Sequence, residues 1–290
     1  MTTEQIDEER RRGRNSGIAA IAGIVIFVAA MGLAGDFNGA EQAEQLKMFD
    51  SVSSDLLLQC ILQAIALLLF LPALITLFRA IQTRVENFRP GLIGVVIVSP
   101  ILLAISLVVA YFAYKSAADA FLEPGKFDTG SNDVANDVFY DQFPTQIRTG
   151  LGLAGSLGLA FTTVFLALNG MRAGLMTRFW GTLAMALGIG TLLFGSVMLI
   201  GYMLLIALLI AGWWPGSRPP AWEAGEAVPW PKPGQPSNVQ QEGDGLAAPG
   251  DFEGTATEIE DPAALSEPDS DPSRPARRDN KRKRKRKQRS

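Results

Sequence analysis

The sequence predicts an all-α, polytopic transmembrane helix bundle of about six spans, followed by a disordered C-terminal tail. Apolar stretches recur between residues 17 and 214, and most reach the ~20 residues that a helix needs to cross a hydrocarbon core of about 30 Å. Arg residues gather in the short connections on one side of the predicted membrane. Beyond residue 214 the chain turns to Pro, Gly, Ser and charged residues, which bury too little apolar surface to order a fold.

Residues 1–16 are predicted to be a basic, cytoplasmic N-terminus, because several Arg residues directly precede the first apolar stretch. That stretch, residues 17–34, is the first predicted span. The alternative is a cleaved secretory signal with the same basic start. We interpret the stretch as a retained anchor, since a signal has a shorter apolar core and the chain behind it is also membrane-like.

The second and third spans, residues 56–78 and 91–114, are both long enough to cross the bilayer. The connection between them, residues 79–90, is too short to hold a domain. Its charged residues are one acid, Glu86, and three cations, Arg79, Arg84 and Arg89. By the positive-inside rule this connection is a cytoplasmic turn.

The fourth span, residues 149–171, leads into a second short turn whose charged residues are Arg172 and Arg178. On the opposite side, the segments 35–55 and 117–146 are rich in Asp and Glu and poor in Lys and Arg. This asymmetry predicts a multi-pass membrane protein with both the N-terminus and the C-terminus cytoplasmic.

Three carboxylates of the second acidic segment, Asp133, Asp137 and Asp141, recur at helical spacing. They predict a short amphipathic helix on the membrane surface. A calcium site is the alternative, but the spacing matches no EF-hand loop, so we expect a solvated acidic face.

The last apolar block, residues 180–214, would extend about 52 Å as a single helix, well beyond a hydrocarbon core. We therefore predict two short spans, residues 180–195 and 199–214, joined by a turn near residues 195–201. Such a turn returns the C-terminus to the side of the N-terminus. The alternative is one long tilted or kinked helix, which gives five spans and an external tail.

The composition argues against most catalytic chemistry. The chain has no His and a single Cys, Cys60, so the commonest metal ligand and the usual general base are missing and no intrachain disulfide forms. No charged residue interrupts the predicted spans, which argues against a pump with a carboxylate relay. The sequence predicts no enzyme, no cofactor and no metal site.

Polar and small residues inside the spans predict helix contacts. Gln59 and Gln63 lie four residues apart and share one face of the second span, where we expect hydrogen bonds to a neighbouring helix. A polar cavity is the alternative. In the fourth span, Gly152, Ser156 and Ala160 form a smooth stripe that predicts close packing within the bundle, with oligomerisation as the second interpretation.

The segment after the last span, residues 214–223, reads Trp-Pro-Gly-Ser-Arg-Pro-Pro-Ala-Trp-Glu. We expect Trp222, and Trp230 farther on, either at the level of the headgroups or docked against the cytoplasmic turns. At these residues, and more loosely at residues 77–80 and 177–181, the chain resembles a family of uncharacterised bacterial multi-pass integral membrane proteins. In that family a Trp-Pro-Gly-x-Arg-Pro-Pro-Ala-Trp-Glu stretch follows the last span. The resemblance implies a bundle of about six helices in the bacterial cytoplasmic membrane, and it supplies no functional residues.

Residues 215–290 are predicted to be a disordered, Pro-rich and acidic tail that ends in a polybasic run. The run comprises Lys281, Arg282, Lys283, Arg284, Lys285, Arg286 and Lys287. Clustered cations bind phosphates, so we expect contacts with anionic lipid headgroups or ribosomal RNA, neither of which requires sequence specificity.

The predicted function is a non-enzymatic helical-bundle scaffold or accessory subunit with a polybasic cytoplasmic tail. Its expected partners are the lipid bilayer, the phosphate-bearing ligands of the tail, and other membrane subunits or further copies of the chain. The alternative is a small-solute transporter or channel. The two differ at Gln59 and Gln63, because a transporter needs a wet cavity near the midplane and a scaffold does not.

Overall fold

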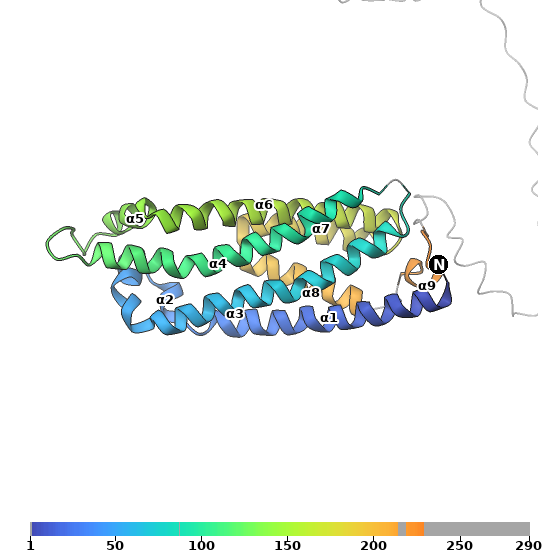
Figure 1. Cartoon of the computed structure of the whole chain (residues 1–290), viewed down its shortest axis with the longest axis horizontal. Coiled ribbons are helices and arrows are strands. Elements are labelled where there is room, and N and C mark those ends of the chain that lie inside the picture. Colours follow the sequence, from blue (N-terminus) through green and yellow to red (C-terminus); the bar gives the residue numbers. More distant parts are fainter. Residues whose placement is uncertain (1, 87, 214–218, 229–290) are drawn as a thin grey trace, which may run out of the picture. The chain divides into compact units, whose positions relative to one another are not determined.

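The computed structural model describes residues 2–86, 88–213 and 219–228. This part of the chain forms helices and no strand, which confirms the predicted all-α transmembrane bundle (Figure 1). The helices are α1 (Thr3–Met31), α2 (Gly35–Gly39), α3 (Gln42–Gln82), the 3₁₀ turn η1 (Pro90–Leu92), α4 (Ile93–Phe121), α5 (Asn132–Asp141), α6 (Phe143–Arg172), α7 (Arg178–Phe194), α8 (Ser196–Ala211) and α9 (Ala221–Ala224). The rest of the predicted tail, with its polybasic run, lies outside the described residues.

Four long helices, α1, α3, α4 and α6, pack side by side in chain order. Helix α7 packs on α6, and α8 packs on both α7 and α1, so the two shorter helices complete a ring. They cover only the half of the bundle that is nearer the N-terminus (Figure 1). We call the end that holds the N-terminus and α9 the terminal end, and the opposite end, which holds α2 and α5, the α5 end.

The last apolar block is two helices and not the single long helix that was the alternative. It folds back at Gly195, the first residue of the interval expected for the turn. Gly195 has φ 58° and ψ −130°, a backbone conformation that L side chains rarely adopt. Helices α7 and α8 therefore form a hairpin that enters and leaves the bundle at the terminal end.

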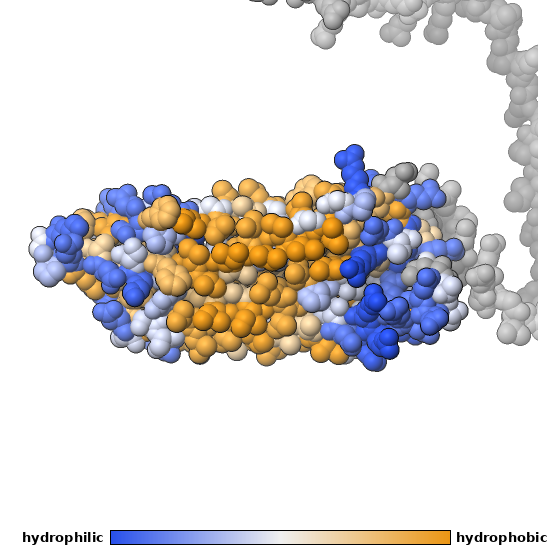
Figure 2. Space-filling view, in the orientation of Figure 1, coloured by the Kyte–Doolittle hydropathy of each residue, from blue (hydrophilic) through white to orange (hydrophobic). Residues whose placement is uncertain are grey.

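The surface between the two polar ends is apolar, as expected for a protein in a bilayer (Figure 2). Among the described helices, α1, α3, α4 and α6 are long and apolar enough to cross a membrane, whereas α7 and α8 have 17 and 16 residues. The exposed apolar side chains of the long helices include Val25, Leu58, Ile65, Val98, Phe112, Leu157 and Phe161. Because soluble proteins rarely expose so continuous an apolar band, the chain is an integral membrane protein.

Several helices extend beyond the predicted spans. Helix α1 includes most of the basic N-terminus, starting from a capping box in which Thr2 and Gln5 satisfy each other's backbone N–H groups. Helix α3 starts at Gln42, well before the span predicted from residue 56. Polar stretches such as these carry no apolar run, but helical propensity and contacts at the two ends of the bundle keep them helical.

The α5 end has a hydrophobic core of its own. Its largest members are Phe37, Leu46, Phe49, Phe121 and Phe139, contributed by α2, α3, α4 and α5. The amphipathic helix expected around the three carboxylates is α5: its Val138 is buried, while Asp133, Asp137 and Asp141 are exposed. Among the described residues, no group of three or more His, Cys, Asp or Glu side chains is placed to hold a metal ion.

Small residues set the distances between helices. On α1, Gly17 faces the backbone of Ala207 in α8, and Gly23 faces the carbonyl of Ala66 in α3. A Cβ atom at Gly17 or Gly23 would lie 2.9 or 2.8 Å from those carbonyl oxygens, closer than side chains tolerate. Of the predicted stripe on α6, Gly152 faces Ser106 of α4 and Ala160 is buried.

Candidate functional site

The most elaborate polar site among the described residues is at the terminal end, around Arg84. The sequence presents Arg79, Arg84 and Arg89 as equivalent charges of one cytoplasmic turn. The structure separates them, because Arg79 and Arg89 are exposed whereas the Arg84 side chain is 0% exposed. A fully buried guanidinium needs a complete set of acceptors, and the surrounding helices supply it.

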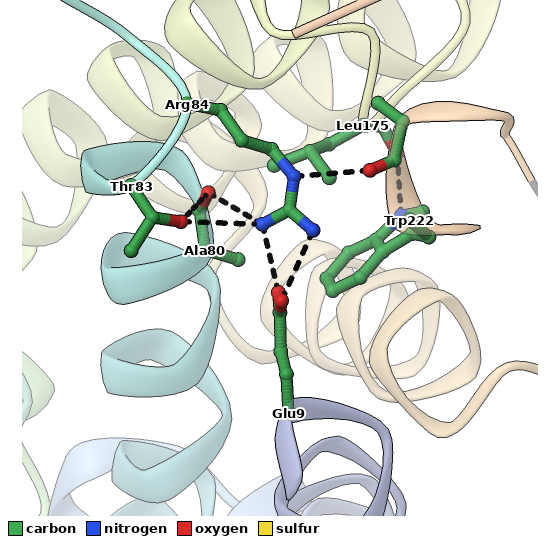
Figure 3. A network of polar contacts seen from close by, with 7 residues as sticks. Glu9, Ala80, Thr83, Arg84, Leu175 and Trp222 are labelled. Atoms are coloured by element: carbon green, nitrogen blue, oxygen red, sulfur yellow. Dashed lines mark hydrogen bonds and ion pairs between the residues drawn. The ribbon is translucent and has the colours of Figure 1, made fainter. Parts of the chain in front are cut away.

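Glu9 of α1 provides the charge partner. Arg84 donates from Nη1 to Glu9 Oε1 at 2.9 Å and from Nη2 to Oε2 at 3.0 Å, a two-bond fork (Figure 3). The Glu9 side chain is 14% exposed, so little water screens the pair. The pair fastens the polar first half of α1 to the end of α3.

Arg84 also donates hydrogen bonds to backbone carbonyl groups. Nη1 also donates to the carbonyl of Ala80 at 2.9 Å, within α3, and Nε donates to the carbonyl of Ala221 at 3.0 Å. The guanidinium carbon lies 5.6 Å from the centre of the Trp222 ring, within cation–π distance. One side chain therefore joins α1, α3 and the segment that follows α8.

Trp222 docks this segment onto the turn between α6 and α7. Its indole is buried and Nε1 donates to the carbonyl of Leu175 at 3.0 Å. Farther along, the N–H of Val228 donates to the carbonyl of Ala173 at 3.2 Å. Of the two expected positions for Trp222, the structure shows the docked one. We call Glu9, Arg84, Leu175, Ala221 and Trp222 the Arg84 clamp.

Gly174 is required at the centre of that turn. It has φ +74°, in the left-handed region, and the space where a Cβ would lie is filled by the carbonyl of Val228. A side chain at this position would therefore both strain the turn and push residues 219–228 off the bundle.

Two clefts flank the Arg84 clamp and both are lined by charged residues. One, of about 390 Å³, lies between α1 and α3 and includes Glu8, Arg12 and Arg79. The other, of about 540 Å³, is lined by residues that include Arg10, Arg11, Arg14, Trp213 and Glu223. The terminal end thus presents many guanidinium groups around one rigid, internally paired centre.

The sequence-predicted residues fall in other places. The polybasic run from Lys281 to Lys287 lies outside the described residues, and so does Trp230. Gln59 and Gln63 are both buried, and Gln59 Oε1 accepts a hydrogen bond of 3.3 Å from Asn38 Nδ2, at the end of the bundle opposite the clamp. The predicted helix contact is therefore present for Gln59, with α2 as the partner.

Sequence reasoning missed the role of Glu9. It lies 75 positions from Arg84 and is one of several acids in a mixed-charge segment, so nothing in the local pattern distinguishes it. Arg84 differs from its neighbours only in lying on the side of the turn that faces α1 and α9.

Comparison of the chain with family models, curated proteins and solved structures finds no match.

Proposed function

We propose that the chain is a non-enzymatic membrane scaffold or accessory subunit, in which the bundle holds the start of a polybasic cytoplasmic tail at a fixed place. The observation that carries the proposal is the Arg84 clamp. The buried ion pair and the docked indole join α1, α3, the α6–α7 turn and residues 219–228. A fixed starting point limits the volume that the tail explores and so raises its effective concentration at the nearby membrane surface.

The distribution of cations supports a cytoplasmic terminal end. The described arginines of that end are Arg10, Arg11, Arg12, Arg14, Arg79, Arg84, Arg89, Arg172 and Arg178. The α5 end has far fewer cations among many acids. By the positive-inside rule the terminal end faces the cytoplasm, here that of a bacterial cell, as the resemblance to bacterial multi-pass proteins also implies.

In this orientation the polybasic run, Lys281 to Lys287, lies in the compartment that holds its two expected ligands. Anionic headgroups of the inner leaflet attract basic segments by about 1 kcal/mol per residue near the surface. Ribosomal RNA offers the same phosphate chemistry at higher charge density. A scaffold with such a tail holds phosphate-bearing partners close to the bilayer.

The cavity at the hairpin tip favours a scaffold over the rival transporter or channel. It has a volume of about 140 Å³ and is lined mainly by apolar groups, among them Phe27, Leu67, Leu103 and Leu159. An aqueous path needs polar lining along its length, and the buried Gln59 is already bonded to Asn38.

Water access at Gln63 tests the proposal. The full chain carrying Cys60→Ser and Gln63→Cys is placed in nanodiscs and treated with a water-soluble, charged thiol reagent. A matched variant with Ser51→Cys, at an exposed position of α3, reports the labelling rate in open water. We expect rapid labelling at Ser51→Cys and none at Gln63→Cys. Comparable labelling at both positions would favour the transporter.

The orientation is tested separately. A reporter that is fluorescent only in the cytoplasm and one that is active only outside are each fused after Ser290. We expect the cytoplasmic reporter to work. Activity of the external reporter would contradict the cytoplasmic tail and, with it, contact of the tail with ribosomes and with the inner leaflet.

A further inference from the structure

A cleft separate from the Arg84 clamp lies in the half of the bundle between the tip of the α7–α8 hairpin and the α5 end. The cleft has a volume of about 430 Å³ and lies where α4, α5, α6 and α7 meet. It includes side chains of three kinds: one cation, hydroxyl groups and apolar groups. Its principal lining residues are Tyr140, Arg148, Thr149, Leu153, Ser156 and Leu192.

Arg148 is the cation of this cleft. Its guanidinium carbon lies 5.6 Å from the centre of the Tyr114 ring and 5.9 Å from that of Phe139. These rings position the guanidinium, and neither of them carries a carboxylate. In contrast to Arg84, Arg148 forms no ion pair with a carboxylate in the described part of the chain. A partly exposed guanidinium held in this way can bind an anion.

The cleft leads from Arg148 into the apolar band. Ser156 also lines it and lies eight positions farther along α6, a rise of about 12 Å at 1.5 Å per residue. At that depth the cleft reaches the hairpin, because Ser156 and Gly195 line one cavity. Next to the hairpin turn, Leu193, Phe194 and Val197 are 77%, 64% and 68% exposed. In a bilayer, these side chains contact hydrocarbon.

The cleft has a cation at one end and apolar side chains toward the other, as a phospholipid has a charged headgroup and apolar chains. Arg148 and the hydroxyl groups of Tyr140 and Thr149 line the part of the cleft nearer the α5 end. Leu153 and Leu192 line the part nearer the hairpin tip, together with the hydroxyl groups of Ser156 and Thr191. Arginine binds phosphate through two parallel N–H donors, and a membrane-embedded apolar wall accepts acyl chains. A soluble phosphate would satisfy the first part of the cleft but leave the second uncovered.

We propose that this cleft binds one phospholipid from the leaflet at the α5 end, with the phosphodiester on Arg148 and an acyl chain along Leu153 and Leu192 toward the hairpin tip. The lipid fills the space between the hairpin tip and the α5 end that none of the described helices occupies. This inference does not depend on the proposed function, since either a scaffold or a transporter can hold such a lipid.

Native mass spectrometry of the full chain, stripped of lipid in detergent and titrated with phosphatidylglycerol, tests the proposal. We expect one lipid to bind tightly to the unmodified chain and its affinity to fall at least about tenfold in Arg148→Gln, because the charge-assisted bonds to phosphate are lost. The matched control is Arg89→Gln, which removes the same charge from an exposed position at the terminal end and should leave the affinity unchanged.

A second variant keeps the charge and fills the cleft. Leu153→Trp, at an exposed position of α6, should weaken binding as much as Arg148→Gln does, and it decides the question if Arg148→Gln elutes as misfolded protein. Equal binding by the unmodified chain and a folded cleft variant would overturn the proposal. Displacement of the lipid by millimolar glycerol phosphate would also overturn it, since the site would then recognise the headgroup alone.

Discussion

Replacing Arg84 by Ala is the sharpest test of the Arg84 clamp. The substitution removes both bonds to Glu9 and the bonds to the carbonyls of Ala80 and Ala221. It leaves a nearly buried carboxylate without its cation, at a place where water has little access. We expect residues 219–228 to detach from the bundle while the membrane-embedded helices keep their packing.

The expected size follows from the burial of the pair. Removing one partner of a buried ion pair costs about 3–5 kcal/mol. Because Glu9 keeps 14% exposure and can rehydrate when the segment leaves, we take the lower end of that range. At 1.4 kcal/mol per tenfold change, about 3 kcal/mol corresponds to a roughly 100-fold increase in the open population of the segment.

Hydrogen exchange measured by mass spectrometry on the full chain in detergent reports this opening directly. The N–H groups of Trp222, Glu223 and Ala224 are bonded within the segment, and that of Val228 is bonded to Ala173. All four N–H groups should exchange roughly 100-fold faster, as expected when a local opening becomes more populated. Peptides from the middle of α3 and α6 should be unaffected.

Arg12→Ala is the matched control. Arg12 also forms an ion pair on α1, with Glu8 at 2.5 Å, but its side chain is 61% exposed. Exposed pairs of this type contribute about 0.3–0.5 kcal/mol, so exchange in residues 219–228 should change less than about threefold. If Arg84→Ala and Arg12→Ala gave the same small change, the Arg84 clamp would not be what holds the segment.

Three further changes have defined outcomes. Tyr202→Phe should raise the melting temperature in detergent. The Tyr202 hydroxyl is buried without a hydrogen-bond partner among the described residues, and its desolvation costs about 1–3 kcal/mol. A lower melting temperature would indicate that the hydroxyl has a partner. Gly195→Ala should lower the melting temperature, because it strains the hairpin turn at a cost of about 1–3 kcal/mol. Gly150→Ala is the control: a Cβ atom there meets open space, so the melting temperature should not fall. Replacing the seven basic residues from Lys281 to Lys287 by Gln should abolish binding of the full chain in neutral nanodiscs to anionic vesicles in a flotation assay; unchanged binding would rule out the run as the lipid contact.

The sequence predicted the features that depend on the bilayer. Apolar length and Arg placement located the membrane helices, and the excess length of residues 180–214 predicted a fold-back within a few residues of Gly195. The amphipathic α5 was predicted from the spacing of Asp133, Asp137 and Asp141. Each of these depends on a property of one segment, so a single sequence contains enough information.

The contacts between helices were harder to predict. In a span that is apolar all round, period 3.6 gives no polar face to show which side meets protein and which meets lipid. The remaining signal is the position of small residues, as at Gly17 and Gly23 of α1, which face α8 and α3. The Glu9–Arg84 pair and the surroundings of Arg148 depend on how whole helices are arranged, and no local pattern encodes that.

The fold-back at Gly195 affects both the Arg84 clamp and the Arg148 cleft, neither of which was predicted from the sequence. If α7 and α8 were one straight helix, residues 219–228 would leave the bundle at the α5 end, and Trp222 would be a full membrane thickness away from Leu175. Because the hairpin turns back part-way along the long helices, the same break leaves the cleft above its tip that Arg148 borders. A single glycine conformation therefore determines both where the tail starts and where the bundle is open to lipid.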